Sequence, residues 1–324
     1  MSESAPLRVG VDLGGTKIEA VVVRLTDEKP EVLVRMRVPT DRDKGYEHVL
    51  STTAALIADV TAKAGLSRPP PIGVGMPGSV TMRAPDGTRS VEPLVKNSNT
   101  TCLNGRPFRR ELSERVGQPI AFANDANCFA LAEAAYGAGR GAKVVFGVIL
   151  GTGVGGGVVF RDSAGRPQIW EGAHGIAGEW GHVTLDPVAG RPCYCGQRGC
   201  IETYLCGPAI EQAYARRSGT SRRLPEIVAR RADDPEARAT LEDVVGTFGR
   251  ALSTIVNTLD PDAIVLGGGV SNLDLLYDEG RRAVASAIFN DELVTRLEKH
   301  ALGDSAGVFG AALLNAVGLH PDGR

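Results

Sequence analysis

Two segments of the sequence place a glycine-rich turn after an apolar run, a composition that can hold a phosphate group. The first is Asp12-Leu13-Gly14-Gly15-Thr16-Lys17, and the second is Gly151-Thr152-Gly153. Glycine lets backbone N–H groups approach a phosphate closely, and a threonine hydroxyl adds a donor. Asp12 would face a metal ion on the nucleotide. The spacing is that of neither a Walker loop nor a dinucleotide fingerprint. One turn alone could be an ordinary tight turn, but the pair predicts a triphosphate held from two sides.

Alternatives stay open for the second turn and for a third glycine segment. Gly155 to Gly157 could form a bulge in a glycine-rich hairpin instead of extending the phosphate site. Gly267-Gly268-Gly269 follows the apolar run Ala263–Leu266. This triplet would leave room for a base and its ribose, and a helix N-terminus without a ligand explains it equally well.

The tetrad Asn124-Asp125-Ala126-Asn127 lies where a predicted strand ends and a predicted helix begins. Proteins of the α/β class place catalytic groups at such junctions. Asp125 is the candidate general base, because a carboxylate that accepts the proton of an attacking hydroxyl fits the chemistry of phosphoryl transfer. The alternative is that Asn124 or Asp125 only caps the helix, which contributes about 1 kcal/mol.

One histidine and three cysteines in a short segment form a full tetrahedral ligand set for zinc. They are His182, Cys193, Cys195 and Cys200. Four protein ligands leave no open position, so the metal would fold the loop rather than take part in the reaction. Unrelated thiols in a cytosolic loop are the alternative. Glu179 and Glu202 flank the cluster and, held rigidly, would accept hydrogen bonds from sugar hydroxyls. Either could instead be a solvated surface charge.

Composition and charge exclude several classes of protein. The formal net charge is −2 over 324 residues with both signs interspersed, which gives no basic field for nucleic-acid phosphates. No signal-peptide core opens the sequence, and no stretch reaches the roughly 18 apolar residues of a membrane span. Three of the six cysteines lie in the zinc segment, which favours metal binding over disulfides. We expect a cytoplasmic protein without nucleic-acid or membrane partners.

The predicted elements position these groups in two related lobes. Strands are expected at Leu7–Leu13, Ala20–Leu25, Glu31–Val38, Pro71–Met76, Ile120–Ala123, Val144–Leu150, Val158–Arg161 and Ala263–Leu266, and helices at Tyr46–Ala64, Ala126–Ala135, Leu241–Leu259 and Asp304–Val317. The recurrence of a strand followed by a phosphate turn indicates an internal duplication. We expect an N-terminal α/β lobe over 1–122, joined by the C-terminal helix 304–324. A larger α/β lobe over 123–303 would carry the zinc loop 182–200.

Taken in order, these motifs resemble the ROK family (repressor, open reading frame, kinase) of bacterial sugar kinases. The motifs that carry the resemblance are Asp12 to Lys17, Gly75-Met76-Pro77-Gly78, Asn124 to Asn127, Gly151 to Gly157, Glu179 to His182, the cysteine cluster and Gly267 to Gly269. The resemblance covers nearly the whole chain. It implies the two-lobed actin and hexokinase-like (ribonuclease H-like) α/β fold, with a central cleft and a zinc-binding loop.

The resemblance also implies a role for each site residue. Asp125 would be the general base. The implied sugar contacts are Gly78, Ser79, Asn99, Asn124, Glu179, His182 and Glu202. His182 would serve the metal with one ring nitrogen and the sugar with the other. The implied ATP contacts are Asp12, Gly14, Gly15, Thr16, Lys17, Gly151, Thr152, Gly153, Gly267 and Gly268.

The reaction implied is transfer of the ATP γ-phosphoryl group, with Mg on the nucleotide, to the 6-hydroxyl of a hexose. The segment from Lys96 to Phe108 is similar to the fructokinase and mannokinase branch, so fructose is the expected substrate; Cys102 stands where those relatives have an aromatic residue. Mannose, glucose and N-acetylglucosamine are the alternatives.

Repressor members carry an N-terminal winged helix, whereas here the phosphate turn begins within the first fifteen residues. A kinase is therefore expected over a sugar-sensing regulator, and a homodimer over a monomer.

Overall fold

The computed structural model describes residues 5–314, which form two compact units. The described part of the first unit comprises residues 5–136, 171–177 and 302–314, and the second comprises 137–170 and 178–301. The predicted lobes placed the helix after residue 123 in the larger lobe, whereas this helix lies in the first unit. Residues 315–324 of the predicted closing helix lie outside the described residues.

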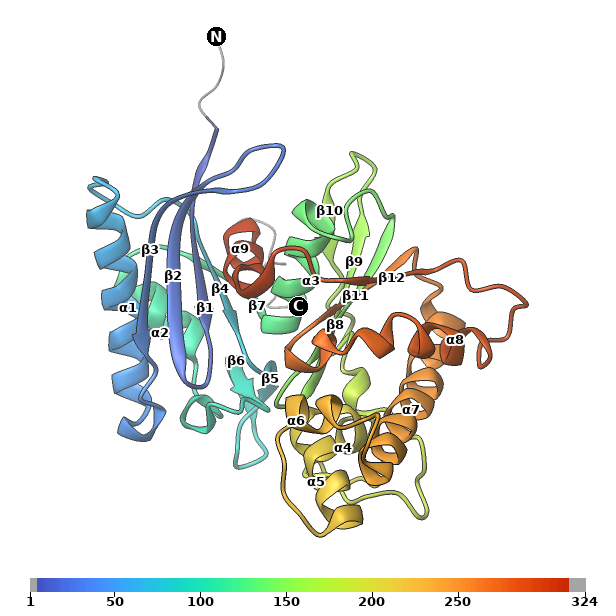
Figure 1. Ribbon diagram of the computed structural model, residues 1–324. Coiled ribbons are helices and arrows are strands. Elements are labelled where there is room, and N and C mark those ends of the chain that lie inside the picture. Colours follow the sequence, from blue (N-terminus) through green and yellow to red (C-terminus); the bar gives the residue numbers. More distant parts are fainter. Residues whose placement is uncertain (1–4, 315–324) are drawn as a thin grey trace. The chain divides into compact units, whose positions relative to one another are not determined.

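A five-stranded sheet forms the centre of the first unit, in the order β3-β2-β1-β4-β7 (Figure 1). Its strands are β1 (Leu7–Leu13), β2 (Lys17–Arg24), β3 (Glu31–Pro39), β4 (Ile72–Met76) and β7 (Ile120–Asn124). The first three strands form an antiparallel meander, as the sequence predicts. β4 and β7 run parallel to β1, so the carboxyl ends of these three strands lie at one edge of the sheet.

The second unit repeats this topology, which confirms the predicted duplication. Its sheet has the order β10-β9-β8-β11-β12. The strands are β8 (Val144–Leu150), β9 (Val154–Arg161), β10 (Pro167–Ile169), β11 (Ala263–Gly267) and β12 (Arg296–Lys299). β8, β9 and β10 form an antiparallel meander, and β11 and β12 run parallel to β8. Each phosphate turn therefore joins the two strands at the start of its own sheet.

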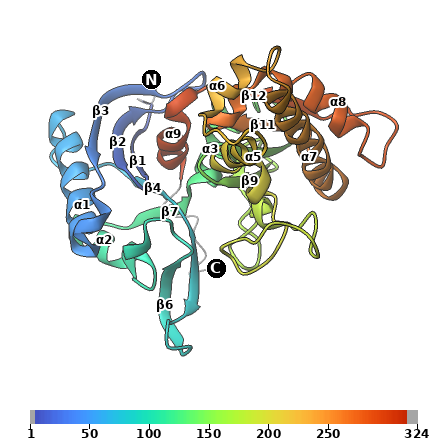
Figure 2. The ribbon, with the colours of Figure 1, turned by 60° about the horizontal axis from the view of Figure 1, so that its bottom comes forward.

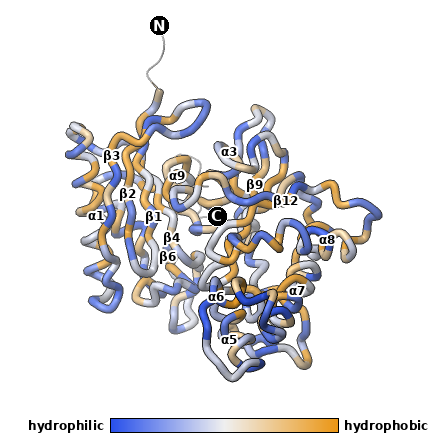
Figure 3. The backbone as a smooth tube through the Cα atoms, in the orientation of Figure 1, coloured by the Kyte–Doolittle hydropathy of each residue, from blue (hydrophilic) through white to orange (hydrophobic). Residues whose placement is uncertain are grey.

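Helices cover both faces of the first sheet (Figure 1). On one face lie α1 (Tyr46–Lys63) and α2 (Phe108–Val116), and on the other lie α3 (Asp125–Tyr136) and α9 (Ala306–Leu313). The strands between these helices are strongly hydrophobic (Figure 3), and the side chains of Val9, Val11 and Leu13 have no exposed surface. Burial of apolar surface from both sides drives this layering.

Glycine allows α9 to pack closely on the sheet and on α3. A Cβ at Gly10 would lie 2.2 Å from the Val308 carbonyl oxygen, and a Cβ at Gly73 would lie 1.9 Å from that of Ala311. On the helix side, a Cβ at Gly310 would lie 1.8 Å from the Cys128 carbonyl oxygen. The absence of these side chains sets the depth at which α9 sits.

The remaining elements surround the two sheets. The hairpin β5 (Ser79–Arg83) and β6 (Arg89–Lys96) extends from the first unit (Figure 2). The helices of the second unit are α4 (Glu202–Leu205), α5 (Gly207–Ser218), α6 (Leu224–Ala229), α7 (Pro235–Leu259) and α8 (Glu279–Ala285). The Asp234 side chain caps α7 by accepting the N–H groups of Glu236 and Ala237.

The structure corrects one sequence-based alternative. Gly155 to Gly157 do not form a bulge: they pair in unbroken register with β8 inside β9. A Cβ at Gly156 would lie 2.8 Å from the Gly178 carbonyl oxygen and 2.8 Å from Cδ1 of Trp180. Glycine is required there by packing against the following loop, so the phosphate turn itself consists of residues 151–153.

Candidate active site

The sheet of the first unit brings its predicted site residues to one edge. Asp12 pairs with Gly75 across β1 and β4, and Met76 pairs with Asn124 across β4 and β7. The residues that follow these strands therefore emerge together, since parallel strands end on the same side. Those that belong to the predicted site are Gly14, Gly15, Thr16 and Lys17 after β1, Gly78 and Ser79 after β4, and Asp125 after β7.

The first phosphate turn is a tight connection between β1 and β2. The Gly14 N–H donates to the Lys17 carbonyl at 2.9 Å, and the Thr40 hydroxyl donates to the Gly14 carbonyl at 2.7 Å. Thr16 and Lys17 are exposed at the tip. A Cβ at Gly15 would lie 3.5 Å from the Asn99 side-chain oxygen, so this turn and the Asn99 loop are neighbours. The turn is open for a ligand on the side of Thr16.

Asp12 is a half-buried carboxylate beneath this turn. Burial raises its pKa to about 7, and the charges of Asp125 and Glu19 contribute in the same direction. Lys17 and Arg37 partly offset these effects. A carboxylate kept in such an environment gains from a cation, because a nearby positive charge favours its ionised form.

Asn124 and Asp125 combine the two interpretations that the sequence leaves open. The Asn124 side-chain oxygen accepts the Ala126 N–H at 2.9 Å, so Asn124 does cap α3. Its side-chain NH₂ donates to the Gly78 carbonyl at 2.9 Å, which ties α3 to the turn after β4. Asp125 Oδ1 also accepts the Ala126 N–H at 2.9 Å. Burial raises the Asp125 pKa, while hydrogen bonds from backbone N–H groups lower it. A raised pKa makes this carboxylate a better proton acceptor.

Two further loops complete this part of the site. Gly78 has φ of 95°, and a Cβ there would lie 2.6 Å from the Lys96 carbonyl oxygen, so the turn before Ser79 requires glycine. Asn99 is exposed, and its carbonyl accepts a hydrogen bond from Arg42 at 3.0 Å. The Asn104 side chain bonds both the N–H and the carbonyl of Ser98, which fixes the loop that carries Asn99.

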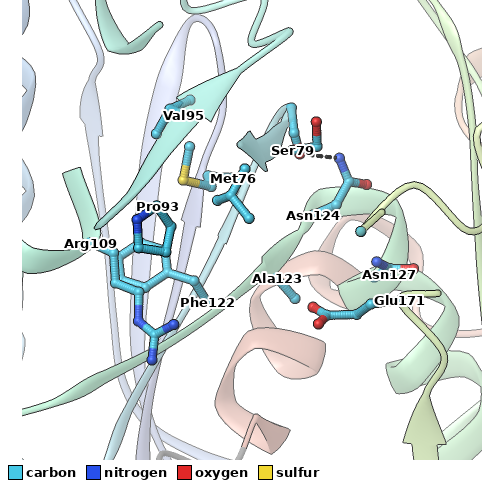
Figure 4. A pocket seen from close by; sticks show the side chains of 13 residues that line it. Met76, Ser79, Pro93, Val95, Arg109, Phe122, Ala123, Asn124, Asn127 and Glu171 are labelled. Carbon is cyan, nitrogen blue, oxygen red and sulfur yellow. Dashed lines mark hydrogen bonds between the residues drawn. The ribbon is translucent and has the colours of Figure 1, made fainter. Parts of the chain in front are cut away.

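A pocket of the first unit extends from this edge. Ser79 and Asn124 line it together with Asn127, Arg109 and Glu171 (Figure 4). Glu171 belongs to the short segment 171–177 that joins the first unit from far along the chain. The sequence did not indicate a role for Asn127, Arg109 or Glu171, because only the folded chain brings α2, α3 and this segment together.

The second unit presents its own phosphate turn at the equivalent edge. Gly151 N–H donates to the Gly153 carbonyl at 2.9 Å, with Thr152 at the tip. Glu202 Oε2 accepts the Val154 N–H at 2.8 Å and lies 2.7 Å from the position of a Cβ at Gly153. Glu202, expected only at the sugar, therefore also braces this turn.

The third glycine segment lies beside this turn, because β11 runs parallel to β8. Gly267 pairs with Ile149, and Gly268 has φ of 82°. A Cβ at Gly268 would lie 2.4 Å from the Leu150 carbonyl oxygen. A 3₁₀ turn, residues Gly269–Asn272, follows instead of an α-helix. The turn at residues 151–153 and the segment at residues 267–269 therefore lie side by side in the second unit.

The predicted zinc ligands converge in the second unit. The candidate ligand atoms of His182, Cys193, Cys195 and Cys200 all lie within 4.8 Å of one another. His182 Nδ1 is 3.7 Å from Cys193 Sγ, and Cys195 Sγ is 3.6 Å from Cys200 Sγ. Tetrahedral zinc with Zn–S bonds of about 2.3 Å separates two sulfurs by about 3.8 Å. The donor set and its spacing fit zinc.

The other ring nitrogen of His182 has a protein partner. Nε2 lies 3.1 Å from the Tyr194 hydroxyl, and the two rings meet edge to face. This is the nitrogen that the family resemblance assigns to the sugar. Tyr194 is 79% exposed, so a ligand hydroxyl could displace it at small cost. Glu179 is exposed, and its carbonyl accepts the His182 N–H at 3.2 Å.

Comparison with known proteins identifies the family. The model of the ROK family matches residues 8–317. The chain belongs to the ROK family. An N-acetyl-D-glucosamine kinase of Photobacterium profundum is 35% identical in an alignment of 317 positions that covers 94% of this chain and 98% of that protein. An N-acetyl-D-glucosamine kinase of Vibrio vulnificus is 34% identical and covers 95% of this chain and 99% of its own length.

Solved ROK structures share the fold over 94–95% of this chain. A ROK hexokinase from Thermus thermophilus is 32% identical with a TM-score of 0.78, covering 95% of this chain and 97% of its own. A ROK glucokinase from Streptomyces griseus, solved with glucose and AMPPNP, is 28% identical with a TM-score of 0.73, covering 94% and 98%. These relatives confirm the predicted actin and hexokinase-like α/β fold. Among residues 5–314, no helix is long and apolar enough to cross a membrane.

Proposed function

We propose that this ROK protein is an ATP-dependent kinase that phosphorylates N-acetyl-D-glucosamine at the 6-hydroxyl. The observation that carries a kinase function is the position of Asp125: a partly buried carboxylate of raised pKa stands at the sheet edge that also carries Asp12 and a glycine turn. Curated relatives of matching length are N-acetyl-D-glucosamine kinases. Fructose, the substrate expected from the sequence, has no support among these relatives. They favour N-acetylglucosamine, which was one of the alternative substrates.

Asp125 would act as general base in this reaction. Its carboxylate accepts the proton of the sugar hydroxyl while the hydroxyl oxygen attacks the γ-phosphorus of ATP. The bond from the γ-phosphorus to the β,γ-bridging oxygen breaks, and ADP leaves with that electron pair. The hydrogen bonds of Asn124 to Gly78 and Ala126 keep α3 and the turn after β4 in register. Asp125 is thereby held on a rigid element, as base catalysis requires.

The glycine turns would hold the nucleotide. Backbone N–H groups near Thr16 and Thr152 would donate to phosphate oxygens, and the segment with Gly267 and Gly268 would lie against the base and ribose. Magnesium, when bound with ATP, neutralises charge that develops on the phosphates. Asp12 is the residue of the first unit suited to hold it, since its carboxylate lies half-buried with two other carboxylates acting on it.

Sugar contacts are proposed for residues of both units. Gly78, Ser79, Asn99 and Asn124 belong to the first unit, and Glu179, His182 and Glu202 to the second. Zinc would bind the His182 and cysteine cluster as a structural metal that leaves no coordination position for a substrate. It would fix the orientation of His182 and the start of α4, where Glu202 lies.

A coupled ADP assay with N-acetylglucosamine, glucose, mannose and fructose tests the proposal. We expect the highest kcat/KM for N-acetylglucosamine. In Asp125→Asn, turnover should fall by about 10²–10⁴-fold while calorimetry still detects sugar binding, since the amide keeps the size but cannot accept the proton. Asp278→Asn, an exposed change in the second unit, is the matched control and should retain normal turnover.

Three outcomes would contradict parts of the proposal. Near-normal turnover of Asp125→Asn would remove Asp125 as the base. A higher kcat/KM for another hexose would reject N-acetylglucosamine as the preferred substrate. Sugar binding without ADP release from any hexose would indicate a sugar-sensing regulator instead of a kinase.

A further inference from the structure

Asn127 is a buried amide with an unused acceptor. Its side chain is 5% exposed, and its side-chain oxygen has no hydrogen-bond partner among residues 5–314. A buried polar atom without a partner costs about 1–3 kcal/mol. Asn127 also lines the pocket that contains Ser79 and Asn124 (Figure 4). A ligand group in this pocket would satisfy the amide.

The rest of the pocket is mainly apolar, with two charged side chains. The apolar lining comes from Met76, Val80, Pro93, Val95 and Phe122. Arg109 lies near Phe122 on one side of the pocket, and Glu171 lies near Asn127 on the opposite side (Figure 4). No ion pair joins Arg109 to Glu171, although each charge acts on the other. Burial lowers the pKa of Arg109 and raises that of Glu171, so both groups have lost part of their hydration.

These features match one substituent in particular. An acetamido group carries one N–H donor, one carbonyl acceptor and one methyl group. The Asn127 side chain can pair with the N–H through its oxygen, or with the carbonyl through its NH₂ if the amide is turned over. The Arg109 guanidinium offers donors to the carbonyl, and the apolar lining can cover the methyl group.

We propose that this pocket binds the acetamido group of the sugar and that Asn127 and Arg109 determine specificity for it. The inference rests on the proposed function and assigns the substituent that separates N-acetylglucosamine from glucose. Asn124 and Ser79 line the same pocket and are proposed sugar contacts, which places the substituent next to the ring. A hydroxyl group in place of the acetamido group is too small to cover the apolar lining, which would stay in contact with water. The sugar lacking the acetamido group therefore gains little from this pocket.

Asn127→Leu is the decisive variant, because leucine has the same number and branching of side-chain heavy atoms as asparagine but no polar atoms. We expect kcat/KM for N-acetylglucosamine to fall by about 10–100-fold and that for glucose to change by less than about 3-fold. The unfolding midpoint in urea should stay equal or rise, since an unsatisfied buried amide is removed. A residue with only a structural role would lower the midpoint or affect both sugars alike.

A second pair of variants keeps the test valid if Asn127→Leu fails to fold. Arg109→Gln should also lower kcat/KM selectively for N-acetylglucosamine. Arg110→Gln, at the adjacent position of α2, removes an exposed arginine that pairs with Glu92 and Glu114, and it should change neither sugar. Equal losses for both sugars in Arg109→Gln, or no loss for either, would overturn the assignment of this pocket.

The wild-type protein separates failure of this inference from failure of the proposed function. If the wild type prefers N-acetylglucosamine and the pocket variants keep that preference, the acetamido group binds elsewhere and only the inference is wrong. If the wild type prefers a hexose without an acetamido group, the proposed substrate is wrong and the pocket assignment falls with it.

Discussion

Asp12 should make the stability of the folded protein depend on pH in a direction opposite to that of most carboxylates. Burial, then the charges of Asp125 and Glu19, raise its pKa from 3.8 to about 7. Well below pH 3.8 the group is neutral in both the folded and the unfolded chain, so it has no effect. As the pH rises towards 7 the unfolded chain ionises first, and the folded state loses relative stability. Above pH 7 the cost is fully present.

The size of this cost follows from the two pKa values. Each pKa unit corresponds to about 1.4 kcal/mol, so a rise from 3.8 to about 7 gives a cost of about 4 kcal/mol at most. Asp12 is half-buried, and solvent screening reduces the figure to about 2–4 kcal/mol. Asp12→Asn is neutral at every pH. The variant should therefore gain this stability over the wild type at pH 8 and a smaller part of it at pH 5.

Urea unfolding of the wild type and Asp12→Asn at pH 5 and pH 8 measures the effect. Asp234→Asn is a control whose effect should not change between these two pH values, since hydrogen bonds from Tyr214 and backbone N–H groups lower the Asp234 pKa. The stability that this carboxylate contributes is fully present above its unfolded pKa of 3.8, so its replacement should cost about the same at pH 5 and at pH 8. A stability difference for Asp12→Asn that is constant with pH, or that shrinks as pH rises, would refute the reasoning.

The remaining predictions concern the metal and the glycines. Metal analysis should find about one zinc per chain, and a chelator or Cys195→Ser should lower the thermal midpoint; full stability and activity in metal-free protein would contradict a structural zinc. In α7, Gly249→Ala should destabilise the protein by about 1–3 kcal/mol, because the new Cβ would lie 2.7 Å from the Ala283 Cβ. Gly246→Ala, where only the tip of Arg250 is near at 3.6 Å, should stabilise it by up to about 1 kcal/mol through helix propensity. Urea midpoints that move in the same direction for both variants would exclude this explanation.

Local patterns in the sequence were sufficient to predict the duplicated fold. An apolar run followed by glycine occurs after Leu13 and again after Leu150, and each marks the first turn of one sheet. The sequence predicted strands at Pro71–Met76 and Ala263–Leu266, and the structure confirms both as the fully buried strands β4 and β11. These features depend on residues close together in the sequence, so they can be predicted from the sequence alone.

Contacts between distant segments could not be predicted in this way. Glycine is unfavourable in strands, yet Gly156 lies inside β9 because the loop at Gly178 packs directly on it. The helix position of Asn127 was predicted, but its missing partner depends on a pocket that forms only when residues 171–177 fold onto the first unit.

The position of α9 has a consequence for synthesis on the ribosome. This helix lies against β1, β4 and α3, and Glu133 accepts the backbone N–H of Leu302 at the approach to it. The part of this sheet face that α9 covers cannot be buried until roughly three hundred residues have been joined, because α9 begins at Ala306. Contacts this distant in sequence slow folding, and the uncovered apolar face is a natural site for chaperone binding during that delay. The second unit, whose segments are all made before α9, should reach its native state first.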